Sequence, residues 1–188
     1  MHHYLLKNAQ QADCYLEFDL YQRAFEKQDL ALLRRLRHQA QDPQPLADVW
    51  EAGSARWVMR DRSSTQRPDL AVWGTFLLLN SHAEQLVRAQ LAADVEFLPL
   101  KVDGESATLA RVLSFWREDP SQTQVCPRTG ELTRLVFDPQ DARGQWVFKS
   151  QMEGCLHLYA TQALKDLCQS EGLQGLAFDP HCLNFFIT

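Results

Sequence analysis

The sequence indicates its fold most clearly in residues 76–100, FLLLNSHAEQLVRAQLAADVEFLPL. The apolar run Phe76–Leu79 is typical of a short buried strand. Ser81 follows where an N-cap hydroxyl would accept from the first free amides of a helix, and Glu84 stands three residues later, as in a capping box. A helix of about ten residues and a second apolar run, ended by Pro99, are expected next. The stretch therefore predicts a strand–helix–strand unit.

Residues 156–180, LHLYATQALKDLCQSEGLQGLAFDP, repeat this order of features. Leu156–Tyr159 is the apolar run, Thr161 is the candidate N-cap, and Gly172 suits the left-handed position just after a helix. A second apolar run again ends at a proline, Pro180. Two explanations stay open, a structural duplication or a coincidence between two common units. Either one predicts a second strand–helix–strand unit.

Upstream of these units the chain predicts a strand followed by a helix. Residues 14–20, CYLEFDL, alternate polar and apolar side chains with the period of a half-buried strand. The period then changes to that of a helix, whose inner face would comprise Phe25, Leu32, Leu33, Leu36 and Ala40. The prolines within residues 42–45 end this helix. A short strand over residues 55–60 and a polar loop over residues 61–69 follow.

The two units are connected by further predicted strands and loops. Asp103 and Gly104 form a hairpin signal, so the alternating segment Ala107–Trp116 is expected to pair with Phe97–Val102. Arg117–Gly130 is polar and contains two prolines, which predicts a long exposed loop. Strands are expected at residues 132–137 and 146–149, and the apolar tail 183–187 is expected to dock as a last strand.

These elements predict the α+β class, with a mainly antiparallel sheet, two strand–helix–strand units and an N-terminal strand–helix segment. The chain has 188 residues, of which 45% are hydrophobic, and this suits one domain with a sizeable core. We expect a single domain over residues 1–188, with residues 1–65 as an N-terminal subregion and residues 70–188 as the core.

The net charge restricts the kinds of partner that the chain could bind, and the cysteines indicate its cellular compartment. Nineteen basic residues against 24 acidic ones give a net charge of −5, which argues against nucleic acid and anionic membranes as partners. The basic cluster Arg34, Arg35, Arg37 and His38 fits the end of a helix, although a phosphate-binding role stays open. The five cysteines follow no disulfide or zinc spacing. Free thiols and the absence of a recognisable signal peptide predict a cytoplasmic protein.

The sequence contains no strong catalytic motif. It lacks a nucleophile elbow and the glycine-rich phosphate loops, and no cysteine has a protease context. His157 is interpreted as a core or edge residue of a strand, and Asp179, His181 and Cys182 are spaced too tightly for one metal site. We therefore expect neither an enzyme, nor a metal, nor a cofactor.

Two stretches resemble immunity protein family 11 of bacterial polymorphic-toxin systems. The sharper one runs from Trp146-Val147-Phe148 through Leu158–Thr161 to the pattern Gly-Leu-x-Gly-x-x-Phe at residues 172–178. The other comprises Leu77–Ser81 and residues 95–102, VEFLPLKV. The likeness covers roughly residues 70–180 and rests on structural glycines, prolines and core residues. It implies a protein that binds and neutralises a toxin, and it supplies no catalytic residues.

An immunity protein needs a surface that covers its toxin, and complementary charge would speed the encounter. We expect a cytoplasm-acting toxin with a basic surface as the partner. The predicted contact surface consists of acidic and aromatic residues on predicted loops, namely Asp103, Glu105, Trp116, Glu118, Asp119, Asp138 and Asp141. Two alternatives are an adaptor or chaperone that loads an effector, and a small enzyme with dispersed site residues.

Overall fold

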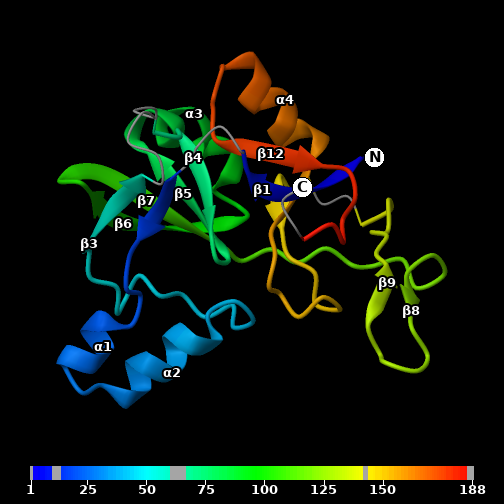
Figure 1. Ribbon diagram of the computed structural model, residues 1–188, viewed down its shortest axis with the longest axis horizontal. Coiled ribbons are helices and arrows are strands. Elements are labelled where there is room, and N and C mark those ends of the chain that lie inside the picture. Colours follow the sequence, from blue (N-terminus) through cyan, green and yellow to red (C-terminus); the bar gives the residue numbers. More distant parts are fainter. Residues whose placement is uncertain (1, 10–13, 60–66, 142–143, 186–188) are drawn as a thin grey trace.

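The computed structural model describes residues 2–9, 14–59, 67–141 and 144–185, and it has the predicted α+β class with mainly antiparallel sheets (Figure 1). In this part of the chain the strands form a six-stranded sheet, a four-stranded sheet and a separate two-stranded hairpin. No helix of the described residues is long and apolar enough to cross a membrane.

The six-stranded sheet has the order β2-β3-β6-β7-β5-β4. Its strands are β2 (Cys14–Glu17), β3 (Gly53–Met59), β4 (Leu70–Trp73), β5 (Phe76–Asn80), β6 (Val95–Val102) and β7 (Glu105–Val112). The β6–β7 hairpin is confirmed: Val102 pairs with Glu105 across a turn in which Asp103 and Gly104 both have positive φ. Such a turn matches the twist of the two strands. The predicted strand over residues 55–60 corresponds to β3, except for residue 60, which lies outside the described residues; β3 pairs with β6 in parallel.

The four-stranded sheet has the order β10-β11-β1-β12, and all its pairings are antiparallel. Its strands are β1 (His3–Asn8), β10 (Val147–Phe148), β11 (Tyr159–Thr161) and β12 (Leu176–Asp179). The amino-terminal strand β1 therefore lies inside a sheet that otherwise comes from the last quarter of the chain.

Both predicted strand–helix–strand units are present, and they share one topology. The first strand of the second unit is Tyr159–Thr161, not the expected run Leu156–Tyr159. Helix α3 (Ser81–Leu91) connects β5 to β6, and helix α4 (Gln162–Ser170) connects β11 to β12. In each unit the two strands run parallel to each other because both pair antiparallel with a strand between them, β7 in the first unit and β1 in the second. Along the chain, β7 follows the first unit, whereas β1 precedes the second unit.

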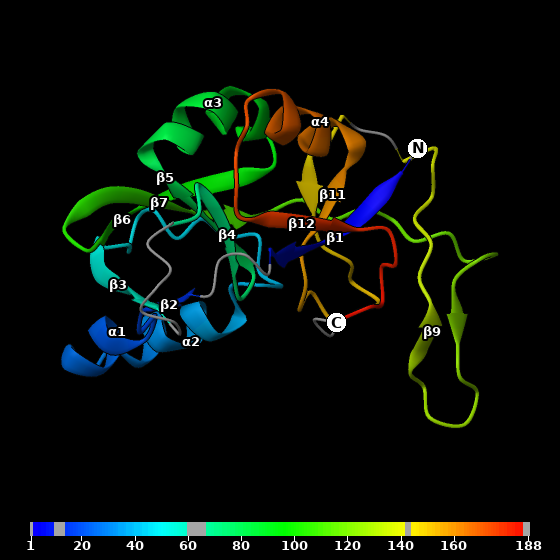
Figure 2. The same ribbon diagram turned by 45° about the horizontal axis from the view of Figure 1, so that its top comes forward.

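Helices α3 and α4 lie side by side over one surface, at the top of Figure 2. Their buried side chains, including Val87, Leu91 and Leu164, join residues of both sheets in one hydrophobic cluster. Two further clusters lie elsewhere in the fold. One packs the N-terminal helices against the six-stranded sheet, and the other is largely aromatic and contains Trp116, Phe137, Phe148 and Tyr159.

The ends of α3 and α4 differ in detail from the prediction. Asn80, not Ser81, caps α3, and its side chain accepts from the Ala83 amide at 2.8 Å. Ser81 Oγ instead donates to the Ser106 carbonyl, and Thr161 Oγ1 donates to the Gln145 carbonyl, so neither hydroxyl caps a helix. Gly172 has the expected left-handed conformation just after α4.

The N-terminal helix is broken in two, which contradicts the single helix expected between Phe25 and Ala40. Helix α1 spans Gln22–Glu26 and α2 spans Leu30–His38. The break occurs because Gln28 adopts a positive φ and the Asp29 side chain caps α2 by accepting from the Leu32 amide at 2.9 Å. Phe25 consequently loses the shared inner face and is exposed.

The expected loop at residues 117–130 contains part of a hairpin instead. Strands β8 (Gln124–Val125) and β9 (Leu132–Arg134) pair and project from the body at the right of Figures 1 and 2. Most side chains of this hairpin are exposed, as predicted. Residues 183–185 form no strand, while residues 61–66 of the expected polar loop and 186–187 of the expected last strand lie outside the described part of the chain.

Candidate functional site

The structure does not bring the predicted contact residues together. Asp103 and Glu105 lie at the β6–β7 hairpin, whereas the other five lie in the segment 116–141 that surrounds β8 and β9. Figure 1 places these two groups of strands at opposite sides of the molecule. One continuous contact surface made of all seven residues is therefore excluded.

Trp116 and Asp141 are buried, so their expected exposure is wrong. The Trp116 side chain is 2% exposed in the aromatic cluster, and its Nε1 donates to the Asp138 carbonyl at 2.8 Å. Asp141 accepts from the Arg117 amide at 2.8 Å. Glu118 is half-buried and accepts from Ser150 Oγ and the Met152 amide. Trp116 and Asp141 therefore stabilise the packing of their own segment, and Glu118 joins this segment to residues 150–152.

The remaining predicted carboxylates are accessible, but three of the four already interact with other residues of the chain. Asp119 accepts from Ser121 and Gln122, and these hydrogen bonds lower its pKa. Asp138 pairs with Arg117 at 2.5 Å, and Asp103 pairs with Arg67 at 2.9 Å. Glu105 is exposed at the start of β7. A role of these carboxylates in binding a partner stays a prediction.

A buried arginine organises the segment that follows α2. The Arg111 side chain, on β7, is completely buried and donates to the backbone carbonyls of Gln39, Asp42 and Gln44. It also forms an ion pair with Glu96 on the neighbouring strand β6, at 3.0 Å. A buried guanidinium is stable only where all its donors are satisfied, and these four acceptors achieve that.

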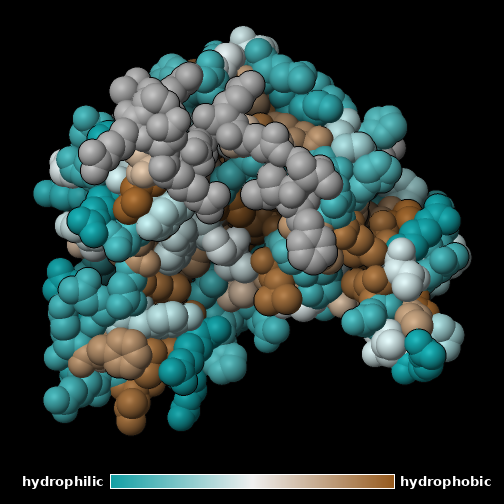
Figure 3. Space-filling view, in the orientation of Figure 1, coloured by the Kyte–Doolittle hydropathy of each residue, from teal (hydrophilic) through white to brown (hydrophobic). Residues whose placement is uncertain are grey.

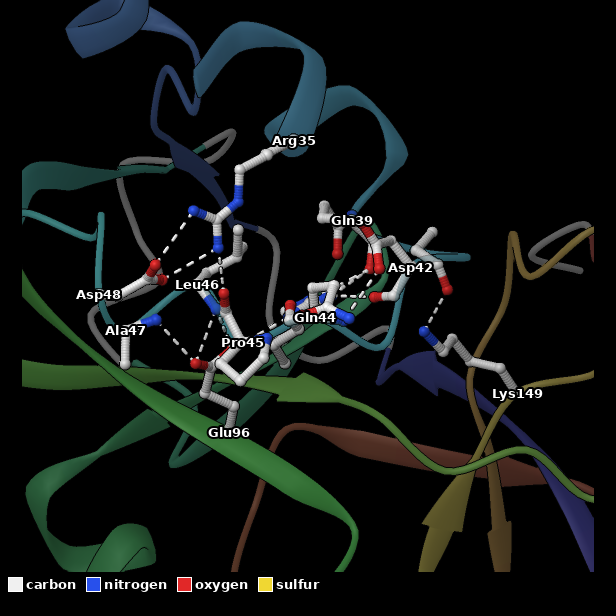
Figure 4. Close-up of polar contacts among 12 residues, drawn as sticks. Arg35, Gln39, Asp42, Gln44, Pro45, Leu46, Ala47, Asp48, Glu96 and Lys149 are labelled. Carbon is white, nitrogen blue, oxygen red and sulfur yellow. Dashed lines mark hydrogen bonds and ion pairs between the residues drawn. The ribbon is translucent and has the colours of Figure 1, made fainter. Parts of the chain in front are cut away.

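Glu96 extends this arrangement to the next residues of the chain (Figure 4). Its carboxylate accepts from the Leu46 amide at 2.8 Å and from the Ala47 amide at 2.7 Å. Arg35 of α2 pairs with Asp48 at 2.9 Å and also donates to the Pro45 carbonyl. Residues 39–48 are therefore tied both to the sheet and to α2, with little freedom to move.

A second buried cation, Lys149, binds the same segment. Its Nζ donates to the Ala40 carbonyl (Figure 4) and lies 4.8 Å from the centre of the Phe115 ring. Burial lowers the pKa of Lys149 to about 8. Arg111 and Lys149 together form what we call the cation clamp. The sequence gives one signal for Arg111, a cation between the apolar neighbours Ala110 and Val112 on a predicted strand, and no comparable signal for Lys149.

Val49 and Trp50, which directly follow the clamped segment, form part of the wall of a groove beside α1 and α2. The groove has a volume of about 230 Å³. Its apolar lining consists of Phe18, Leu20, Leu32, Leu36, Val49 and Trp50. Charged side chains of α1 lie at its rim, where Arg23 approaches Glu51 at 3.7 Å and Lys27 forms an ion pair with the same carboxylate.

Two large apolar side chains stand exposed on these helices. Phe25 is 58% exposed at the end of α1, and Leu30 is 76% exposed at the start of α2. Figure 3 shows brown atoms at the lower left, where Figure 1 places α1 and α2. We define the α1–α2 face as Phe25, Leu30 and the groove. Sequence reasoning missed it because Phe25 was expected to point inward.

The surroundings of His157 and His181 favour a functional site less than the α1–α2 face does. His157 Nδ1 lies 2.6 Å from Glu153, and its ring stacks on Phe185 with the centres 4.0 Å apart. Asp179 pairs with Lys7 at 2.8 Å and also accepts from the His181 amide. Within the described residues no group of three or more potential ligands could hold a metal ion.

In comparison with known proteins, the chain matches no family model and no curated protein.

Proposed function

We propose that this chain is an immunity protein that binds a bacterial toxin and neutralises it by covering its surface, without a reaction of its own. The α1–α2 face is the contact surface in this proposal. The observation that supports it best is the exposure of Phe25 and Leu30 on two helices whose other residues line an apolar groove. The resemblance of residues 70–180 to immunity protein family 11 suggests the kind of partner.

The physical basis is the energetics of protein interfaces. A few large apolar or aromatic side chains near the centre of an interface supply most of the binding energy. Leu30 and Phe25 are available for such contacts because they bury little surface within the chain. The groove between α1, α2 and Trp50 has room for an apolar side chain of the partner.

The cation clamp also favours tight binding. Arg111, Glu96 and Lys149 fix residues 39–48, which lead directly into the groove wall at Val49 and Trp50. Since this wall is already ordered in the free protein, little conformational entropy is lost when a partner binds. The five free cysteines are consistent with the cytoplasm as the place of this encounter.

Co-expression tests this function. The candidate toxin is a neighbouring gene product whose expression stops bacterial growth. It is expressed in a sensitive bacterium with and without the chain, and growth is recorded. We expect growth to be restored and the purified pair to form a stable complex in which the toxin is inactive. A complex with a fully active toxin would indicate an adaptor, and rescue without any complex would indicate an enzyme. Either result would overturn the proposed function.

A matched pair of variants tests the surface. Leu30→Asp places a charge on the α1–α2 face, and Leu156→Asp places the same charge at a site that is 65% exposed on another loop. Loss of a central apolar contact weakens an interface by about 2 kcal/mol or more, so L30D is expected to lose at least about thirtyfold in affinity. L156D is expected to bind like the wild type. Equal affinities for the two variants would remove the α1–α2 face from the interface.

A further inference from the structure

The charges of this chain are segregated. Residues 22–41, which include α1 and α2, contain five arginines and lysines and two acidic residues, a net charge of +3. Because the whole chain carries −5, all other residues together carry −8. The helical part that bears the exposed Phe25 and Leu30 is therefore a basic region on an acidic protein.

Two arginines share the exposed side of α2 with Leu30. Leu30, Arg34 and Arg37 are spaced by four and three residues, which places them on one side of a helix, and all three are exposed. Arg35 is used differently, because it pairs with Asp48 at 2.9 Å. Within the described residues, Arg34 and Arg37 form no ion pair. We call Leu30, Arg34 and Arg37 the α2 outer face.

The helix dipole does not account for this face. Cations in the last turn of a helix are favourable, which explains Arg37 and His38. Arg34 precedes that turn, and no dipole effect favours an exposed leucine at position 30, in the first turn. A surface that combines an apolar side chain with two guanidinium groups that form no ion pair among the described residues instead has the composition of an interface, where arginine is enriched.

We propose that the α2 outer face binds an acidic protein surface that also presents apolar side chains to Leu30. This rests on the proposed function and specifies its partner: the toxin surface that meets α2 is acidic there. The net charge alone suggested a basic partner. At contact distance, however, a partner experiences the local cations of α2, because charges beyond about 8 Å are largely screened at physiological salt.

The alternative anionic partner, nucleic acid, is less well matched. Binding to a phosphate backbone requires several cations that each neutralise a phosphate. The α2 outer face offers two, next to an exposed leucine that a phosphate backbone would leave in water. The −8 on the rest of the chain would also repel an extended polyanion.

Fluorescent peptides test this inference without the toxin. One amphipathic peptide carries glutamates between its leucines, and a second, of equal length and leucine content, carries lysines. Their affinities for the full chain are measured by anisotropy at low salt. Although the chain is acidic overall, we expect the glutamate peptide to bind at least about tenfold more tightly than the lysine peptide. A preference for the lysine peptide, or no binding of either, would overturn the inference.

Two double variants with the same change in charge locate the effect. Arg34→Glu with Arg37→Glu alters the α2 outer face, while Arg128→Glu with Arg134→Glu alters two exposed arginines near the projecting β8–β9 hairpin. Only R34E/R37E should lose the preference for the glutamate peptide, with an unchanged melting temperature. If both double variants lost this preference equally, the preference would depend only on the net charge of the chain, and the inference would be contradicted.

A duplex DNA oligonucleotide serves as the third probe. We expect it to bind more weakly than the glutamate peptide at every salt concentration, and tighter binding would assign α2 to nucleic acid instead. These probes fail or succeed independently of growth rescue. If the chain preferred the glutamate peptide but left the toxin active, the inference of an acidic partner would stand and the proposed immunity function would be wrong.

Discussion

Arg111 is the residue on which the N-terminal part depends most. It satisfies the carbonyls of Gln39, Asp42 and Gln44 and the carboxylate of Glu96 inside the protein. Removing one partner of a buried pair leaves an uncompensated charge, which costs about 3–5 kcal/mol. We therefore expect Arg111→Met to lower the free energy of unfolding by that amount in urea titrations.

The exposed pair of Arg117 with Asp138 provides the control for Arg111. Because exposed pairs contribute about 1 kcal/mol or less, Arg117→Met should change stability only slightly. Equal effects of R111M and R117M would show that the cation clamp does not hold residues 39–48 in place.

His3 makes stability depend on pH. Its ring lies among aromatic side chains, 4.6 Å from Trp116 between ring centres, and its Nε2 is buried without a hydrogen-bond partner in the described structure. Burial is the main cause that lowers the pKa of His3 from 6.5 to about 4. Between these pH values the unfolded chain binds a proton that the folded chain does not, so stability falls as the pH is lowered through this window.

The variant His3→Phe isolates this effect, since a phenyl ring fits the aromatic surroundings and does not titrate. Relative to H3F, the wild type should lose on the order of 2 kcal/mol of stability between neutral pH and about pH 4. Carboxylates titrate in both proteins and cancel in the comparison. Unfolding curves at several pH values provide the measurement, and a constant difference between the two proteins would contradict the assignment.

At the scale of elements, the two sheets are joined through Gly175. The Leu70 amide at the start of β4 donates to the Gln174 carbonyl, and Asn8 binds both backbone groups of Val72. Gly175 has φ +114, and a Cβ at this position would lie 2.1 Å from the Leu70 carbonyl oxygen. Only glycine fits this approach of β12 to β4.

Gly175→Ala is therefore expected to lower the free energy of unfolding by about 3 kcal/mol or more, because the strands must separate to admit the methyl group. Gly130→Ala is the matched control: Gly130 also has a positive φ, but open space surrounds it. Its cost should be about 1 kcal/mol. Thermal unfolding of both variants measures the difference, and similar melting temperatures would show that β4 and β12 are not tightly joined.

The regular elements could be predicted from local patterns, and their interruptions could not. Apolar runs and an Asp-Gly turn were enough to identify β5, α3, β6 and β7. The break between α1 and α2 depends on Gln28 and Asp29, neither of which is a strong helix breaker. The helical spacing of apolar residues continues across Gln28 and Asp29, so it predicted one helix with Phe25 on its buried face.

The capping residues show the same limit at finer scale. Asn80 and Ser81 are both good caps, and the choice between them depends on where β5 ends, which is fixed by its pairing with β7 through Asn80 and Ala107. A single sequence does not contain that register.

For the whole molecule, the class and the two units could be predicted, but the way they combine could not. Strand β1 completes the second unit from the opposite end of the chain, a pairing of long sequence separation. The predicted contact surface failed in part for the same reason, because loops that look alike in sequence lie far apart in the fold. Trp116 and Asp141 are buried by segments that local patterns do not place against them.

Hydrogen–deuterium exchange of the free chain and of its complex with the toxin domain tests the central claim most directly. If the α1–α2 face is the interface, the amides of residues 22–37 and 48–51 will exchange more slowly in the complex, because binding excludes water and suppresses local opening of the short helices. Unchanged exchange there, with protection confined to the β6–β7 turn or to the β8–β9 hairpin, would contradict it.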